Sequence, residues 1–135
     1  MRFEELDKLY PNGFVDAELI SIRIDYPDRV AEFRVRLRTE GPDSPERDVY
    51  RAATLTLRNM VYVTVEPPDA QHLLYATGKS LTFDAFPEDP AAFPAASAVA
   101  EKIVRDGFAC RFFVHDWNSF IHVAAACAEF TVGDS

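Results

Sequence analysis

The stretch that decides the fold is residues 17–38, which read AELISIRIDYPDRVAEFRVRLR. Apolar and polar side chains alternate on both sides of Pro27, and a period of two places the apolar side chains on one face of an extended chain. Pro27 cannot adopt the positive φ that a two-residue primed turn requires, so we expect a four-residue turn at Tyr26–Arg29. The stretch therefore predicts an antiparallel hairpin with one buried face.

The length of this turn predicts the register of the hairpin. Arg23 then lies opposite Glu32 on the polar face, which is a favourable cross-strand charge pair. Before Ile20 the apolar phase slips by one residue, which indicates either a β-bulge near Leu19–Ile20 or a strand end covered on both faces. The expected pairs are Asp25–Val30, Ile24–Ala31, Arg23–Glu32, Ile22–Phe33 and Ile20–Val35, with Arg34 and Arg36 facing away from the core.

A second hairpin of the same kind is expected near the C-terminus, with its turn at 116–119. The other face of its final strand carries alanines, which let a helix approach closely. The best helical pattern lies at 94–105, with Pro94 in the first turn, and we expect this helix to pack there. The apolar face consists of Phe108, Cys110, Phe112 and Val114 on the first strand and Ile121, Val123, Ala125 and Cys127 on the second; the opposite face carries Phe120, His122, Ala124, Ala126 and Ala128.

The remaining segments complete one α+β domain over residues 1–135. Arg58–Asn59 is either a tight turn or a bulge within one long strand. The sequence predicts a largely antiparallel sheet of six to seven strands with one principal helix packed on it; a two-sheet β-sandwich is the alternative. The remaining segments are helical turns in 3–10, a loop at 40–46, strand character in 48–65, a short helix in 69–77, a strand in 80–86 and a proline-rich loop in 87–94.

The composition is that of a folded protein with an acidic surface. Of 135 residues, 48% are hydrophobic and 27% charged, so a core can form without disulfides or metal. The net charge of −8 disfavours nucleic acids and anionic membranes as partners. Residues 59–135 carry ten acidic and four basic groups, which favours a basic protein partner. Because no signal peptide or long apolar run is visible, we expect a cytoplasmic location and reduced cysteines.

No familiar catalytic or cofactor motif occurs. There is no glycine-rich phosphate loop, nucleophile elbow, HExxH or paired CxxC, so we expect neither a cofactor nor an enzyme. His115 and His122 flank the last turn beside Asp116 and face each other across the hairpin in a tight register, so two imidazoles with a carboxylate could hold a divalent metal. A further ligand at sensible spacing is missing, so we predict no metal there.

The two cysteines allow two interpretations. Cys110 and Cys127 would face each other if the last turn had two residues, and a disulfide is then geometrically conceivable. Their core-facing phase and the expected cytoplasmic setting favour two buried free thiols that behave as small apolar side chains.

Trp117 is the most suggestive single residue for binding. It lies at the expected hairpin tip beside Asp116 and His115, and exposed tryptophan is enriched in binding hot spots. The alternative is that its ring folds back over the edge of the sheet. We predict a substantially exposed Trp117 that anchors a partner, with Asp116 and His115 beside it.

Charged residues suggest two further sites. Asp16 and Glu18 share one face of a strand, and two carboxyl groups can serve as general acid and general base in catalysis. A pocket between sheet and helix, lined by these two with Arg36 and His122, is the alternative site, for a small-molecule ligand or an enzyme. The basic stripe Arg34, Arg36 and Arg38 could bind an anion, although a solvated face balanced by neighbouring acids is the favoured interpretation.

Residues 13–22, GFVDAELISI, and residues 55–60, LTLRNM, resemble small bacterial β-rich domains that are grouped with the immunity proteins of polymorphic toxin systems. Family members more usually have His where this chain has Val15. The resemblance implies an antiparallel sheet, no catalytic residues and binding of a toxin. The expected function is therefore non-enzymatic binding, as an immunity-type inhibitor of a basic protein, by a monomer or homodimer.

Overall fold

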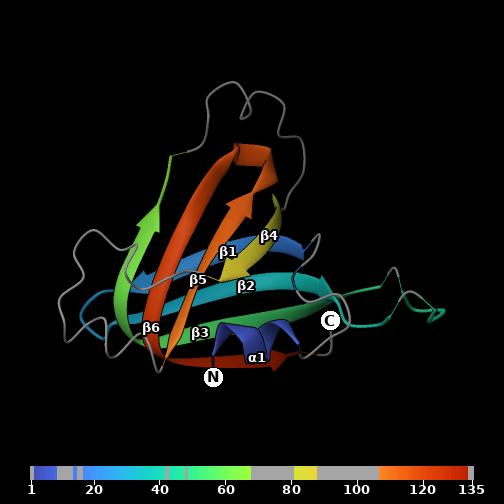
Figure 1. The fold of residues 1–135 in the computed structure, drawn as a ribbon, viewed down its shortest axis with the longest axis horizontal. Helices are drawn as coiled ribbons and strands as arrows, with labels where there is room; N and C mark the ends of the chain where they lie inside the picture. The colour runs from blue at the N-terminus through green and yellow to red at the C-terminus, as the bar shows by residue number, and fades with distance from the viewer. Residues whose placement is uncertain are drawn as a thin grey trace.

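The structure is a computed structural model that describes residues 2–8, 14, 17–41, 43–47, 49–67, 81–87 and 107–133. The described strands form a closed antiparallel barrel in the order β1-β2-β3-β6-β5-β4 (Figure 1). In Figure 1, β4, β5 and the first part of β6 cross in front of β1, β2 and β3. The elements are α1 (Phe3–Asp7), β1 (Ala17–Asp25), β2 (Val30–Arg38), β3 (Tyr50–Val65), β4 (Leu81–Pro87), β5 (Phe108–Val114), the 3₁₀ helix η2 (His115–Trp117) and β6 (Ser119–Val132).

The predicted antiparallel, strand-rich architecture is confirmed, but the sheet is closed. β1 pairs with β4, with Ala17 opposite Phe83, and this pairing joins the two ends of the sheet. A closed barrel differs from both an open sheet and the alternative two-sheet sandwich, because neither edge is left unpaired. The helices expected at 69–77 and 94–105 lie outside the described residues. The helical turns expected within 3–10 appear as α1.

The β1–β2 hairpin has the predicted turn and most of the predicted register. Ile22 lies opposite Phe33 and Arg23 opposite Glu32, as expected. A bulge between Leu19 and Ser21 shifts the register, so Leu19 faces Val35, and the predicted Ile20–Val35 pair is wrong. Of the two alternatives for this strand end, the bulge is therefore the correct one. It leaves Ile20 on the outside, with 45% of its surface exposed.

The long strand β3 bends where it leaves β2. Asn59 has a φ of 54° and lies within β3, so Arg58–Asn59 is not a turn between two strands. The expected long strand is confirmed, and its register against β6 shifts just beyond this point, between Met60 and Tyr62. Arg29, at the end of the first turn, holds the bend from the side. Its Nε donates to the carbonyl oxygen of Met60 at 3.0 Å, and its own carbonyl accepts from the amide of Met60 at 2.9 Å. Beyond this point β3 continues against the first half of β6, which curves the sheet toward closure.

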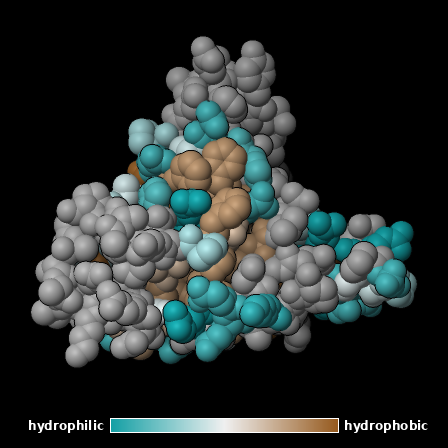
Figure 2. Space-filling model, viewed as in Figure 1, coloured by the Kyte–Doolittle hydropathy of each residue, from teal (hydrophilic) through white to brown (hydrophobic). Residues whose placement is uncertain are grey.

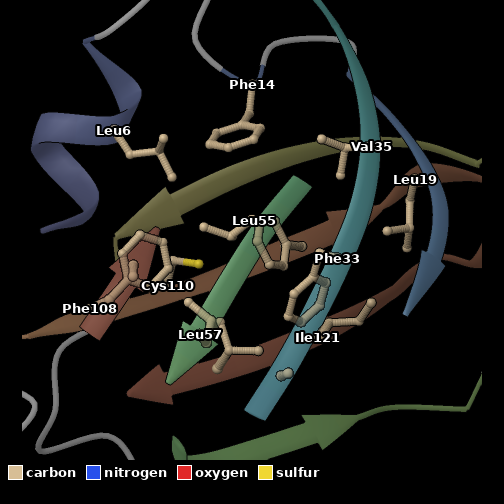
Figure 3. Packing of buried hydrophobic residues seen from close by; sticks show 14 of the residues in the cluster. Leu6, Phe14, Leu19, Phe33, Val35, Leu55, Leu57, Phe108, Cys110 and Ile121 are labelled. Carbon is tan, nitrogen blue, oxygen red and sulfur yellow. The ribbon is translucent and has the colours of Figure 1, made fainter. Parts of the chain in front are cut away.

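Phenylalanine rings fill the barrel. The Phe112 ring lies 5.1 Å from that of Phe83 and 5.3 Å from that of Phe33, measured between centroids. Phe14, which precedes β1, stacks on the same cluster at 5.8 Å from Phe83. Figure 3 shows Phe14 and Leu6 of α1 pointing into this core. Apart from the buried Ser119, the described interior is thus occupied by apolar side chains, and most polar groups available for binding lie on the outer surface.

The C-terminal hairpin confirms the predicted apolar face except at its end. The predicted inward residues from Phe108 to Ala125 are buried, but Cys127 is exposed. The inward phase of β6 changes after Ala125, so that Ala128 faces the core and Cys127 faces outward beside Arg58 of β3. Cys110 lies opposite Val123, which rules out the conceived disulfide, and neither cysteine is part of a disulfide bond. Ala124, on the predicted alanine face, is fully buried with Ala109 and Tyr62 beside it.

Candidate binding surface

The outer face of β4, β5 and β6 carries an aromatic cluster that the strand register assembles. Asp84 of β4 lies opposite Phe113 of β5, which in turn lies opposite Phe120 of β6. In the next row, Phe86, Arg111 and His122 follow one another across the same three strands. We call the set Phe86, Arg111, Phe113, Phe120 and His122 the aromatic face.

Arg111 occupies the centre of the aromatic face. The carbon at the centre of its guanidinium lies 5.6 Å from the ring centroid of Phe86 and 5.9 Å from that of Phe120. Both distances are within the range of cation–π attraction, which is worth about 0.5–1 kcal/mol at exposed sites. The two rings therefore hold an exposed arginine in place, with its hydrogen-bond donors available at its edge.

The remaining aromatic contacts make the face continuous. The rings of Phe113 and Phe120 lie 5.0 Å apart, and the His122 ring lies 5.8 Å from that of Phe120. Phe86 is 40% exposed and the rings of Phe113 and Phe120 are half-buried. Figure 2 shows apolar side chains gathered over β5 and β6, with hydrophilic ones around them. Aromatic side chains and arginine are enriched in protein–protein interfaces, and the aromatic face has the same composition.

Polar contacts fix the border of the aromatic face. His115 Nε2 lies 2.9 Å from Asp84 Oδ2, and its ring contacts Phe113 at a centroid distance of 5.0 Å. On the other side, the Phe120 amide donates to Glu66 Oε1 at 2.6 Å. The first contact ties η2 to β4, and the second ties the end of β3 to β6.

The structure places the predicted binding residues differently from the sequence interpretation. Trp117 is half-buried and packs against the core, so the expected substantial exposure is not found. His115 pairs with Asp84 rather than lying across from His122, because β5 ends in η2 and His122 faces Arg111. The side chain of Asp116 lies outside the described residues. Within the described ranges, no group of three or more His, Cys, Asp or Glu gathers where a metal could bind.

The alternative pocket is brought together only in part. Glu18 and Arg36 lie opposite each other on β1 and β2, with their charged atoms 4.0 Å apart. Asp16 lies outside the described residues. His122 belongs to the aromatic face, between Arg111 of β5 and Thr64 of β3, and is not a neighbour of the other two by register.

The sequence contains a signal for the aromatic face that an interpretation based on the inward-facing residues does not use. Phe113 and Phe120 stand in the outward phase of their strands, where alternation predicts polar side chains. Phe86 ends the strand expected at 80–86. Aromatic side chains at outward positions on neighbouring strands could have indicated an exposed cluster, but the pairing of β4 with β5 was needed to join them.

No family model, curated protein or solved structure matches the chain. In the part of the chain that the structure describes, no helix is long and apolar enough to cross a membrane.

Proposed function

We propose that this protein is a non-enzymatic binding protein whose aromatic face docks onto a protein partner. The observation that carries the proposal is the exposed guanidinium of Arg111, held between the rings of Phe86 and Phe120. Arginine and aromatic anchors contribute most of the binding free energy in many interfaces. An anchor whose bound conformation is already favoured in the free protein also loses less side-chain entropy when a partner binds.

The proposed partner is a basic protein, and the proposed role is immunity-type inhibition, in line with the sequence resemblance. The net charge of −8 attracts a basic molecule over long range and raises its association rate. Nucleic acid is disfavoured by the same charge, although aromatic rings on a sheet can also stack on bases. The net charge thus favours a basic protein over a nucleic acid as the partner of this surface.

The test begins with Phe86→Ala and Arg111→Ala, compared with Arg58→Ala. Arg58 is also an exposed arginine, but it lies on β3, where it pairs with Glu129 at 3.2 Å. A partner recovered with the unmodified protein is produced separately, and its binding is measured by titration calorimetry. Loss of a hot-spot side chain costs about 2 kcal/mol or more, so each aromatic-face variant is expected to weaken binding about 30-fold.

The charge of the partner is tested by the salt dependence of association. A basic partner is expected to associate more slowly as salt rises, while the dissociation rate depends mainly on the aromatic face. Unchanged binding by both aromatic-face variants, or association that does not slow with salt, would contradict the proposal. Inhibition of the partner's own activity at a one-to-one ratio would support the immunity role, and an undiminished activity in the complex would refute it.

A further inference from the structure

A groove of about 730 Å³ lies on the outer surface of β1, β2, β3 and the end of β6. Of the strands that carry the aromatic face, β6 alone also lines the groove, and it does so at its opposite end. The residues that line the groove include the outward-facing Ile20, Arg34, Arg36, Ala52, Thr54 and Thr131. A concave site of this size matches the usual range for small-molecule sites.

The strand register creates a polar row across the groove. Arg34 lies opposite Ser21 on one side and opposite Thr54 on the other, and Thr54 in turn lies opposite Thr131 of β6. Arg34, Thr54 and Thr131 point outward, because their neighbours along the strands face the core, and Ser21 beside the bulge is also exposed. The row therefore places a guanidinium beside hydroxyl groups on one surface of the barrel.

The bulge in β1 supplies an apolar wall for the same groove. By adding one residue to the strand, it turns Ile20 outward next to the register position of Arg34. The Ile20 side chain is 45% exposed, and contact of its apolar surface with water is unfavourable in free energy. Bulges often re-aim a side chain at a binding site, and Ile20 with the small Ala52 gives this groove its apolar lining.

The charge surroundings of Arg34 differ from those of three other arginines on β2 and β3. Arg58 and Arg51 have carboxylate partners at 3.2 and 3.1 Å, and Arg36 has Glu18 at 4.0 Å. Arg34 makes no ion pair with any residue in the described ranges, and Glu32, the nearest acid along its strand face, lies opposite Arg23. A protein with a net charge of −8 thus keeps one guanidinium unneutralised inside a concave site.

We infer that this groove binds a small amphipathic oxyanion, a carboxylate or phosphate attached to an apolar body. Guanidinium binds both groups through two parallel hydrogen bonds, which a lysine cannot do. The hydroxyls of Thr54 and Thr131 donate to the remaining oxygens, and Ile20 and Ala52 cover the apolar body. The groove does not include any residue of the aromatic face, so this inference is tested independently of the proposed function.

The test is a titration of the full chain followed by amide chemical shifts in NMR. Octanoate and octyl phosphate are the anionic probes, and octylammonium and octanol are the controls with the same chain, all used below micelle formation. Saturable shifts are expected at the amides of Arg34, Thr54 and Thr131. The anion that binds more tightly identifies the headgroup. Octylammonium and octanol are expected to bind at least ~10-fold more weakly, because they lack the charge that guanidinium pairs with.

Matched variants locate the site. Arg34→Gln is expected to weaken binding of the better anion by about 10-fold, whereas Arg58→Gln on the same barrel wall leaves it unchanged. Ile20→Ser is expected to weaken binding of the octyl chain while preserving the preference for the anion. The inference is overturned if neither anion binds saturably, if octylammonium binds equally well, if Arg34→Gln has no effect, or if the shifts map to β4 and β5.

Discussion

Replacing Gly107 with alanine should strongly destabilise the barrel, because the new methyl group has no space. A Cβ built at Gly107 would lie 2.4 Å from the carbonyl oxygen of Ala125 and 2.8 Å from that of Ala126. Both are backbone atoms of β6, which is paired with β3 and β5 along this stretch. Relief needs a shift of about 1 Å in a strand held on both sides, and overpacking of this kind typically costs about 1–3 kcal/mol.

Thermal unfolding followed by circular dichroism measures this cost. For a chain of this length, 1 kcal/mol corresponds to about 4 °C in Tm, so Gly107→Ala should lower Tm by about 4–12 °C. Gly133→Ala is the matched control, since its Cβ would lie 3.7 Å from its nearest neighbour, the carbonyl oxygen of Ala52. At that site alanine restricts the unfolded chain and should change stability by less than about 1 kcal/mol, in the stabilising direction. Equal melting temperatures for the two variants would refute the packing argument.

Three other predictions concern the core, the last turn and the cysteines. Phe112→Ala removes a ring packed on three others and should cost about 3–5 kcal/mol in urea unfolding, while Phe86→Ala at the surface should cost about 1 kcal/mol or less, chiefly through loss of the cation–π contact with Arg111. Trp117→Ala should lower the free energy of unfolding by about 2 kcal/mol, because the half-buried ring packs on the core; an unchanged Tm would instead support the interpretation of Trp117 as an exposed binding anchor. A thiol reagent should modify Cys127 in the folded protein and Cys110 only after unfolding, and equal rates at both would contradict the burial of Cys110.

The candidate site was only partly predictable. His115 was identified from its place at the turn, but its partner Asp84 lies on a strand that no local pattern connects to it. Alternation along β5 places Arg111 on the outer face, yet the two rings around it come from β4 and β6. The predicted exposure of Trp117 was wrong because the alternation of a strand does not extend into a turn. Whether the Trp117 ring folds onto the core depends on the space that neighbouring strands leave.

The sequence by itself determined the hairpins, because alternation along one strand and the conformational limits of Pro27 are local properties of the chain. It also determined that β1 is bulged or doubly covered, since the slip in phase is visible at Leu19–Ile20. Tertiary structure decided that the bulge turns Ile20 outward, that β3 bends at Asn59, and that β1 closes on β4. These outcomes depend on which strands become neighbours, and strand pairing is set by how the whole sheet twists and buries its apolar face. The aromatic face and the groove both arise from that pairing, because each is built from side chains on several strands.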